Sequence, residues 1–362
     1  MSESQGFLFG QPPPKSRAVL PARVSDEVRE LGAKLPRRLH LGTSSWSFPG
    51  WAGIVYESRA DEASHRDVTL AERGLSAYAA HPVLRSVGVD RAFYRPPSVA
   101  SYESLASQTP PNFRFLVKAY QGLTRPYADG EGRTHGLAGG GAGGGGNMGK
   151  NALFLDDQYA AEQVVKPAFA GLGARCGVIV FQFPPIEFGD TARQRQAGLT
   201  DEGEFLERLE AFLLGLRSRL GEAVPVALGV ELRSDEVLNR RWAGRYAGLL
   251  ARTGCVHVYA AHPSMRGVVA QEEALGAAAL AGPCVVRWML RSNHRYEEAK
   301  DFYAPFNALA EPDGAVRGQV VDVVTKSLRQ EKDCIVIINN KAEGSAPLSC
   351  IELGKAIVSG GV

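Results

Sequence analysis

The sequence has few cysteines, almost no net charge and no long apolar run. Its 362 residues include five cysteines, and 41 Lys and Arg residues against 39 Asp and Glu residues leave a formal charge of +2. A chain this balanced does not bind nucleic acid through bulk charge alone, although a local basic face stays open. The longest uncharged apolar stretch, residues 274–286, contains Gly276, Gly282 and Pro283. It is shorter than the roughly 20 residues of a membrane-spanning helix, so we expect no membrane partner.

The N-terminal residues lack the basic start and long apolar core of a secretory signal. The cysteines are odd in number and far apart, with no C-x-x-C pair. Four of them begin or adjoin apolar runs, which favours small buried hydrophobic residues over disulfides or structural zinc. The five positions are Cys176, Cys255, Cys284, Cys334 and Cys350. Together these features predict a soluble, cytoplasmic protein.

Eight short apolar runs alternate with amphipathic segments along the chain. The runs are residues 39–42, 86–93, 113–119, 177–183, 226–232, 255–260, 284–290 and 334–339. Helical spacing of apolar residues predicts helices over 70–80, 204–220, 241–252 and 316–329. Strands that alternate with helices pair in parallel, because a parallel crossover needs a long connection. The pattern predicts a TIM-barrel-like (β/α)8 fold of the α/β class, with a doubly wound open sheet as the alternative.

The expected organisation is one barrel with appended segments. Residues 1–24, rich in Pro, Ser and Gly, predict a mobile tail, and 25–38 a short helix that Ser25 caps, followed by a linker. The barrel is expected over 39–355 and a C-terminal tail over 356–362. A flexible insertion over 120–151 carries the glycine tract 136–149. The end of this tract and the following lysine match the nucleotide-binding motif G-x-x-x-x-G-K, a match that glycine-rich sequences give easily by chance. Because Asn151 stands where such a site needs Ser or Thr, we reject a nucleotide site.

Six segments carry a family resemblance. They are LGTSSWSFPGWAGIVY (41–56), RAFYRPPS (91–98), TPPNFRFLVKA (109–119), VIVFQFPP (178–185), VALGVELR (226–233) and IINNKAEGSAP (337–347). In this order they resemble the domain-of-unknown-function 72 family, the YecE-like proteins, over roughly 39–353. The resemblance implies a TIM-barrel-like fold and no established reaction.

The chain departs from that family pattern at three strand ends. Gly88 stands where the resemblance implies a Glu, and Asp90 where it implies an Asn. After the fifth run, Ser234 stands where the resemblance implies a side chain with a basic ring. After the seventh run, Met289 stands where it implies a His. These replacements indicate either an altered substrate or a barrel that binds a ligand without catalysis.

The candidate catalytic residues lie at strand ends, because the active site of such a barrel lies at its C-terminal mouth. They are Glu231, Lys118 and Asp90. Glu231 and Arg233 are two apart on one strand and so share a face, where the carboxylate is a candidate general base. The alternative is a buried structural ion pair. Lys118 is expected to bind an anion or, if desolvated, to have a lowered pKa.

Further polar and aromatic residues at strand ends are candidates for substrate binding. They are Arg233, Arg287, Trp46, Tyr94, Gln182, Asn339 and Asn340. Trp46 either stacks on a sugar or base or packs the first loop against the barrel. The two asparagines bind sugar-like hydroxyls or satisfy loop backbone groups.

Four cations, Arg287, Arg291, Lys118 and Lys341, form a cationic rim if all point inward, which favours a phosphorylated or carboxylated ligand. A divalent metal is weakly supported and the cofactor stays unknown. His257, His262, Asp90 and Glu231 lack the spacing of a metal motif. His257 is interpreted as a core histidine.

The tail adds a different class of partner. Gln5, Leu8 and Phe9 resemble the short Gln-x-x-Leu-Phe peptide by which bacterial DNA-repair proteins dock on the replication sliding clamp.

Three functions therefore remain open. The first is a hydrolase or isomerase acting on a small anionic or sugar-like substrate. The second is a DNA-repair-associated, nuclease-like or accessory protein tethered to the clamp, and the third is a non-catalytic ligand-binding barrel.

Overall fold

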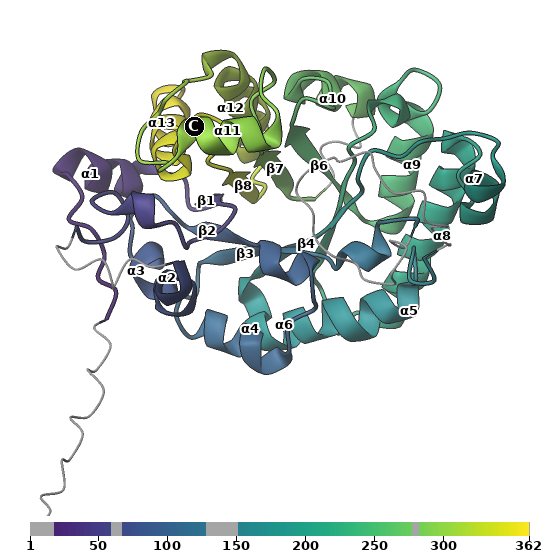
Figure 1. The fold of residues 1–362 in the computed structure, drawn as a ribbon, viewed down its shortest axis with the longest axis horizontal. Coiled ribbons are helices and arrows are strands. Elements are labelled where there is room, and N and C mark those ends of the chain that lie inside the picture. Colours follow the sequence, from purple (N-terminus) through teal and green to yellow (C-terminus); the bar gives the residue numbers. More distant parts are fainter. Residues whose placement is uncertain (1–17, 59–66, 128–150, 277–281, 362) are drawn as a thin grey trace, which may run out of the picture.

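Eight parallel strands pair in sequence order and close on themselves, as the computed structural model shows (Figure 1). The structure describes residues 18–58, 67–127, 151–276 and 282–361. The strands are β1 (Leu39–Thr43), β2 (Ser86–Val89), β3 (Arg114–Lys118), β4 (Cys176–Gln182), β5 (Ala227–Glu231), β6 (Val256–Ala261), β7 (Cys284–Trp288) and β8 (Cys334–Ile338). β1 pairs with β8, from Leu39 beside Cys334 to Thr43 beside Ile338. This closure confirms the predicted TIM-barrel-like fold and excludes the open sheet.

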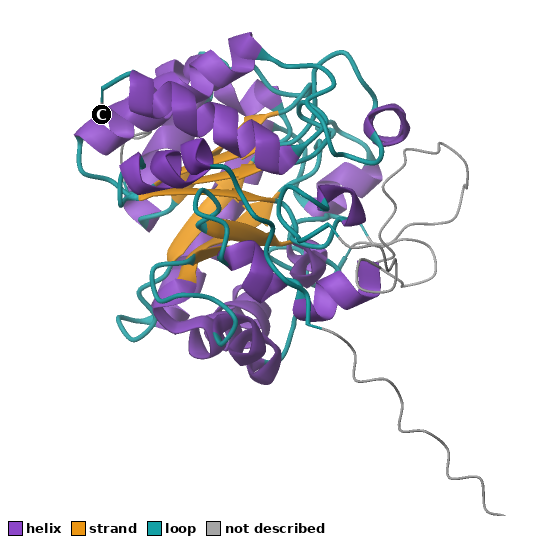
Figure 2. Ribbon diagram, turned by 90° about the vertical axis from the view of Figure 1, so that its left-hand side faces the viewer, coloured by secondary structure: helices purple, strands orange, loops and turns teal. Residues whose placement is uncertain are grey.

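Helices surround the strands on the outside (Figure 2). Along the first half of the chain they are α1 (Asp26–Lys34), α2 (Asp67–Arg73), α3 (Leu75–Ala79), α4 (Val99–Ala106), α5 (Asp157–Tyr159) and α6 (Lys166–Leu172). The second half adds α7 (Ala192–Ala197), α8 (Glu202–Leu220), α9 (Ala243–Thr253), α10 (Val268–Leu275), α11 (Tyr296–Tyr303), α12 (Gly314–Arg329) and α13 (Ala346–Ser359). Within the described ranges, no helix is both long and apolar enough to cross a membrane.

Most predicted elements are present with small changes at their ends. Ser25 caps α1 as expected, because its side chain accepts a hydrogen bond from the Val28 amide. The helix predicted over 70–80 is two helices that meet at Gly74. The second apolar run is also shorter than predicted, since Asp90–Phe93 leaves the sheet as a 3-10 turn, η3. That turn decides where Asp90 and Phe93 lie at the end of the barrel.

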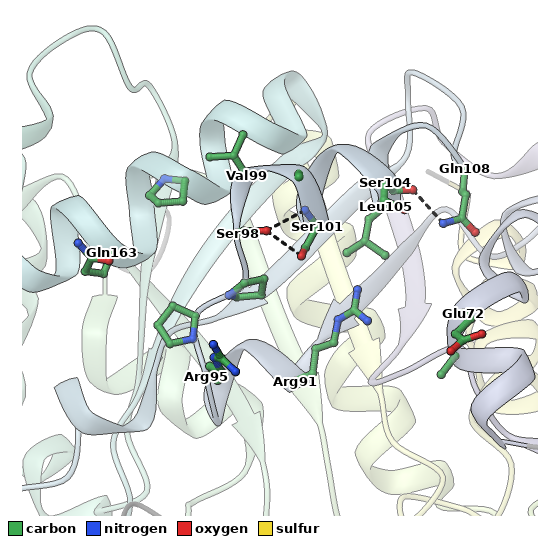
Figure 3. Close-up of a pocket in the computed structure, with 15 residues that line it drawn as sticks. Glu72, Arg91, Arg95, Ser98, Val99, Ser101, Ser104, Leu105, Gln108 and Gln163 are labelled. Atoms are coloured by element: carbon green, nitrogen blue, oxygen red, sulfur yellow. Dashed lines mark hydrogen bonds between the residues drawn. The ribbon is translucent and has the colours of Figure 1, made fainter.

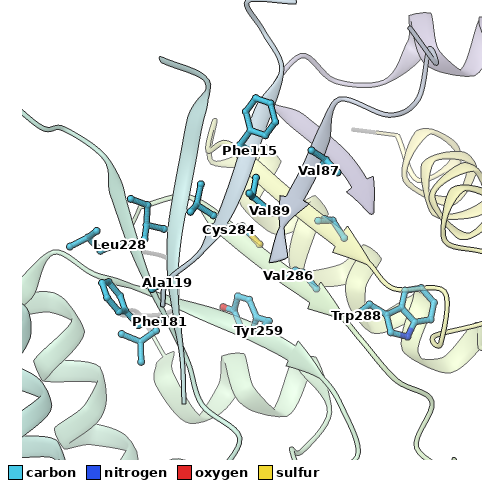
Figure 4. Close-up of a cluster of buried hydrophobic side chains, with 14 of the residues drawn as sticks. Val87, Val89, Phe115, Ala119, Phe181, Leu228, Tyr259, Cys284, Val286 and Trp288 are labelled. Carbon is cyan, nitrogen blue, oxygen red and sulfur yellow. The ribbon is translucent and has the colours of Figure 1, made fainter. Parts of the chain in front are cut away.

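The strands bury two different faces. One face packs outward against the helices, as Phe181 does against Phe212 of α8, with ring centroids 5.3 Å apart. Figure 4 shows part of this outer cluster, which includes Val87, Phe115 and Trp288. The alternate residues form a separate, smaller cluster inside the barrel: Leu116, Val178, Val180, Val256, Val258, Val285, Ile335 and Ile337. All five cysteines are buried, as predicted.

Candidate functional site

The interior face of the strands changes from apolar to polar at their carboxyl ends. Successive side chains on a strand alternate between faces, so residues two apart point the same way. Leu116 is therefore followed inside the barrel by Lys118, Val180 by Gln182, and Val285 by Arg287. The register places Gln182 directly beside Glu231 on the neighbouring strand. The predicted site residues of β3, β4, β5 and β7 thus meet at one end of the barrel.

Glu231 lies at the centre of this group between two guanidinium groups. Its side chain is 0% exposed, and that of Arg287 is 1% exposed. Arg287 Nη1 donates to Glu231 Oε2 at 2.5 Å, and Arg233 Nη2 donates a short hydrogen bond to Glu231 Oε1. Arg287 Nη1 also donates to Gln182 Oε1 at 3.1 Å. These contacts connect β4, β5 and β7 across the barrel.

The two arginines keep Glu231 ionised. Burial alone raises the pKa of a carboxyl group, but the charges of Arg233 and Arg287 outweigh it and lower the pKa of Glu231 to about 2. A carboxylate with so low a pKa is a weak base near neutral pH. The contacts of Glu231 therefore favour the ion-pair alternative, in which it fixes the position of both arginines.

Asp90 lies at the outer side of the same group. It begins the 3-10 turn η3, and its side chain is 34% exposed. Arg287 Nη2 is 3.6 Å from Asp90 Oδ1, too far for a hydrogen bond. In the part of the chain that the structure describes, Asp90 Oδ1 and the Nε atoms of Arg233 and Arg287 have no hydrogen-bond partner. Asp90 is thus a carboxylate with a free oxygen beside a buried cation.

Lys118 ends β3 and lies over an aromatic ring instead of on a carboxylate. Its Nζ is 3.6 Å from the ring centroid of Phe93. Among the described residues it forms no hydrogen bond or ion pair, and its side chain is partly exposed. Burial lowers the pKa of Lys118 to about 8, because desolvation and the charge of Arg287 outweigh the attraction of Asp90. Lys118 is a partly desolvated amine without a fixed partner.

The two histidines near the barrel lie on different faces. His257 is outside the barrel, where its ring nitrogens contact the Tyr246 hydroxyl and Gln271 Oε1, each at 3.1 Å. This matches the interpretation as a core histidine. His262 follows β6 at the mouth, and its Nδ1 accepts from the Ser264 amide at 3.1 Å. Burial and the nearby Arg233 lower the pKa of His262 to about 3, so it is neutral and presents Nε2–H.

No group of three or more His, Cys, Asp or Glu side chains that could hold a metal ion occurs in the described segments. His257 faces away from the mouth, so it does not join His262, Asp90 and Glu231. Both carboxylate oxygens of Glu231 accept from guanidinium groups, which repel a metal ion.

The aromatic candidates have different surroundings. Trp46 is 4% exposed, and its indole N–H donates to the carbonyls of Leu70 and Ala71 at 3.1 and 3.2 Å. This places Trp46 in the contact between the first loop and α2. Tyr94 is 52% exposed and packs edge-on against Phe93, with ring centroids 5.5 Å apart. Tyr94 therefore lies beside Lys118 and Asp90 at the rim, where a ligand can reach it.

The two asparagines after β8 have different partners and different exposure. Asn339 donates to Ser44 Oγ at 3.2 Å and is partly exposed at the mouth. Asn340 is buried and accepts from the Ala346 amide at 2.8 Å, at the start of α13. Asn339 can contact a ligand, whereas the carbonyl of Asn340 serves the backbone of the final helix.

The predicted cationic rim is only partly present. Arg291 contacts Glu311 and Asp313, each at 3.7 Å, and donates to the Glu311 carbonyl at 2.7 Å. The two acidic residues therefore neutralise the charge of Arg291 outside the mouth. Lys341 is 6% exposed and lies 4.0 Å from the ring centroid of Tyr296, and burial lowers its pKa to about 8. Lys118 and Lys341 remain as two desolvated amines at the mouth.

Two of the three departures from the family pattern, Gly88 and Ser234, have a local structural reason. A Cβ on Gly88 would lie 3.0 Å from the Ser44 carbonyl oxygen, so the backbone directly after β1 occupies the space of a side chain. Ser234 Oγ accepts from the Ile186 amide at 2.8 Å and joins the loops after β4 and β5. Met289 is half-buried at the end of β7. The mouth of this chain therefore relies on Asp90, Lys118 and the arginines.

Sequence reasoning missed two aromatic residues of the mouth, Phe93 and Tyr296. Each lies under a lysine amine, Lys118 and Lys341 respectively. Phe93 was included in a predicted strand, and its position depends on the 3-10 turn that replaces the strand end. Tyr296 begins α11 and is 44% exposed. The available sequence signal is an aromatic residue in the segment that follows β7.

A groove of about 1090 Å³ lies outside the barrel, between η3, α4 and α6 (Figure 3). Its polar groups are used locally. Ser98 Oγ accepts from the Ser101 amide at 3.2 Å, and Gln108 donates to the Ser104 carbonyl at 2.8 Å. Arg91 and Arg95 are exposed there. The groove has none of the buried charge of the mouth, which we take as the candidate site.

Two sequence predictions fall outside the described residues. The peptide with Gln5, Leu8 and Phe9 lies within 1–17, and the glycine tract lies within 128–150. The structure therefore gives no test of a sliding-clamp partner or of the insertion.

Comparisons with known proteins agree with the fold. The family model described as "Protein of unknown function DUF72" matches residues 40–359. A DUF72 family protein from Enterococcus faecalis has 16% sequence identity and a TM-score of 0.53, over 88% of this chain and 95% of that chain. A second, from Thermotoga maritima, has 17% identity and a TM-score of 0.51, over 88% and 98%. No curated protein matches the chain.

Proposed function

The chain belongs to the DUF72 family, and for this member we propose an enzyme that acts on a small anionic substrate at the C-terminal mouth of the barrel. The observation that carries the proposal is the charge of the mouth. Lys118, Arg233 and Arg287 stand against the two carboxylates of Asp90 and Glu231. Lys341 adds a further cation at the rim. An excess of desolvated positive charge at the mouth favours an anionic ligand.

The proposed roles follow from exposure. Arg233 and Arg287 are nearly covered, so they act mainly through their charge while Glu231 fixes their positions. Lys118, Gln182 and Asn339 are partly exposed and are the groups that contact substrate. The amide groups of Gln182 and Asn339 suit the hydroxyls of a sugar-like anion. Tyr94 closes the outer side of the site.

Of the two reaction classes, isomerisation by proton transfer fits these groups better than hydrolysis. Asp90 takes the role of general base, because its side chain is 34% exposed and its Oδ1, which is buried on the side of Arg287, has no hydrogen-bond partner among the described residues. The positive charge of Lys118 and the field of Arg287 stabilise the oxyanion that develops when a proton is removed beside a carbonyl group. Asp90 and Lys118 lie close enough that each charge acts on the other.

The proposal is tested with wild type, Lys118→Met and Asp90→Asn in a thermal-shift panel of sugar phosphates, small carboxylates, nucleotides and neutral sugars. An anion at 100 times its Kd is expected to stabilise the wild type by about 2.7 kcal/mol. Lys118→Met is expected to weaken this effect. Asp90→Asn is expected to bind the anion at least as well, because it removes a negative charge from the site.

Turnover is measured by NMR as exchange of a carbon-bound proton of the bound anion in D2O. Wild type is expected to exchange it, and Asp90→Asn to lose exchange while keeping binding. Equal stabilisation by neutral sugars, or no response to any anion, would contradict the anionic substrate. Binding without exchange in the wild type would instead support the non-catalytic barrel.

A further inference from the structure

We propose that Lys118 forms an imine with an aldehyde or ketone that carries a carboxylate or phosphate group. This inference rests on the proposed function, because it assigns a covalent step to the same site. It also narrows the substrate to a small anionic carbonyl compound. Neither the sequence motifs nor the comparisons assign such a role to this residue.

The position of Lys118 supports the proposal. A lysine that serves only to balance charge lies against a carboxylate, as Lys166 does against Glu162 at 2.5 Å. Lys118 has no such partner among the described residues and lies over the face of Phe93 instead. Its side chain is partly exposed at the mouth, so a small molecule can reach Nζ. The rigid strand β3 fixes its Cα at the barrel wall.

Lys341 is the competing amine, and the geometry favours Lys118. Lys341 is 6% exposed and covered by Tyr296, and the charges that act on it most are those of Glu297 and Lys300. The charges that act on Lys118 are those of Asp90, Arg287, Glu231 and Arg233, which are the proposed machinery. Asp90 acts on both amines, whereas Glu231, Arg233 and Arg287 act on Lys118, which places Lys118 closer to the groups that can use an imine.

The lowered pKa makes the amine available. With a pKa of about 8, Lys118 is in the neutral, nucleophilic form for about one molecule in ten at pH 7. An ordinary lysine with a pKa near 10.4 is neutral in fewer than about one in a thousand. Covalent catalysis by lysine depends on such desolvation.

The step balances without a further reactant. The Nζ lone pair attacks the carbonyl carbon, and the carbonyl π electrons move to its oxygen. The nitrogen passes one proton to the oxygen, the oxygen takes a second proton from the solvent and leaves as one water molecule, and a protonated C=N bond remains. Asp90, whose charge acts on Lys118, is the group that carries the proton between nitrogen and oxygen. The protonated imine then withdraws electrons from the neighbouring carbon, whose proton Asp90 removes. In this covalent form of the proposed isomerisation the imine nitrogen replaces the carbonyl oxygen as the electron acceptor, so no oxyanion develops.

The test is reductive trapping with sodium cyanoborohydride and glyceraldehyde 3-phosphate, with neutral glyceraldehyde as the matched compound. The reagent delivers hydride to the imine carbon, so each trapped chain gains the mass of the carbonyl compound less one oxygen atom. Peptide mapping is expected to locate one label at Lys118, formed at least about tenfold faster than at exposed lysines. The phosphate compound is expected to label faster than the neutral one. The labelling rate is expected to rise with pH and level off above about pH 8.

Two variants and one binding measurement separate the possible failures. Lys118→Arg keeps the charge and is expected to lose the label, whereas Lys166→Arg, an exposed lysine paired with Glu162, is expected to keep it. Label at Lys341, or spread over exposed lysines, would overturn the proposal. Calorimetry with inorganic phosphate tests anion binding alone. Phosphate binding without a label would overturn the imine and leave the anion site standing, and absence of both would overturn both.

Discussion

Two layers of the barrel interior come from the same strands and have opposite chemistry. The inner layer consists of Leu116, Val180, Gly229, Val285 and Ile337, which are apolar and nearly or fully buried. Two residues further along the same faces lie Lys118, Gln182, Glu231, Arg287 and Asn339. Two residues along each strand, which is one period of the side-chain alternation, thus separate the apolar core from the candidate site. The apolar layer closes the barrel below the charges and keeps their surroundings partly dry.

The two layers contribute to stability in different ways. Each fully buried aliphatic side chain of the inner layer stabilises the fold by about 1.5–3 kcal/mol. The ion pairs of the mouth add little net stability, because the desolvation of the charges offsets their attraction. Removal of one charge, however, leaves its partner buried and unpaired. We therefore expect the mouth to tolerate removal of a pair better than removal of one member.

The largest expected effect is that of Arg287→Met. It leaves Glu231, 0% exposed, with one of its two guanidinium partners, and is expected to lower the free energy of unfolding by about 3–5 kcal/mol in urea titrations. The double variant Glu231→Gln/Arg287→Met removes the carboxylate charge as well. It is expected to recover part of that loss. A loss below about 1 kcal/mol in the single variant would show that the pair is not buried in solution.

Leu116→Ala tests the other layer on the same strand. Removing a fully buried leucine side chain is expected to lower the free energy of unfolding by about 2–5 kcal/mol. Anion binding at the mouth is expected to persist at a temperature where the variant is folded. Lys118→Met, two residues on, is expected to give the reverse result, with little change in stability and weaker anion binding. Equal effects of both variants on binding would remove the distinction between the layers.

The pH dependence of stability also follows from burial at the two ends. Burial lowers the pKa of His40, at the opposite end of the barrel, to about 4, and that of His262 at the mouth to about 3. The unfolded chain takes up protons near pH 6.5, whereas these folded histidines resist protonation. Their stabilising contribution is therefore complete above pH 6.5 and is lost as the pH falls toward 4. Urea titrations are expected to show a loss of at least about 1 kcal/mol between pH 7 and pH 5, and a smaller slope in His262→Asn.

The smallest expected effect on stability is that of Asp90→Asn. The carboxylate is 34% exposed and 3.6 Å from Arg287, so its loss is expected to change the free energy of unfolding by less than about 1 kcal/mol. Since Asp90 attracts the Lys118 ammonium, the same variant is expected to lower the pKa of Lys118 further. A large loss of stability would assign Asp90 a structural role instead.

The fold could be predicted because it depends on local patterns. Apolar runs with regular helical segments between them are visible along the chain, and all eight strands lie at the predicted runs. Asp90–Phe93 is the exception, since the chain there turns away as a 3-10 turn. No periodicity marks that turn, because its residues DRAF are as compatible with the end of a strand as with a 3-10 turn.

The candidate site could be predicted only as a set of strand ends. Alternation places Glu231 and Arg287 inside the barrel, but their contact depends on the register of strands far apart in sequence. The same holds for Arg291, whose partners Glu311 and Asp313 come from a loop with no strand signal. Alternation with Val256 and Val258 is compatible with an inward His257 as well as with a core histidine, and the structure places the ring outside the barrel.

The most direct measurement is the titration of Lys118 by NMR, with its amine dimethylated with 13C and assigned by the loss of its signal in Lys118→Arg. A midpoint near pH 8 is expected for Lys118, against about 10.4 for exposed lysines in the same spectrum. Addition of inorganic phosphate is expected to raise the midpoint, because a bound anion stabilises the ammonium form. A midpoint near 10.4 that phosphate does not change would contradict a desolvated, anion-binding mouth.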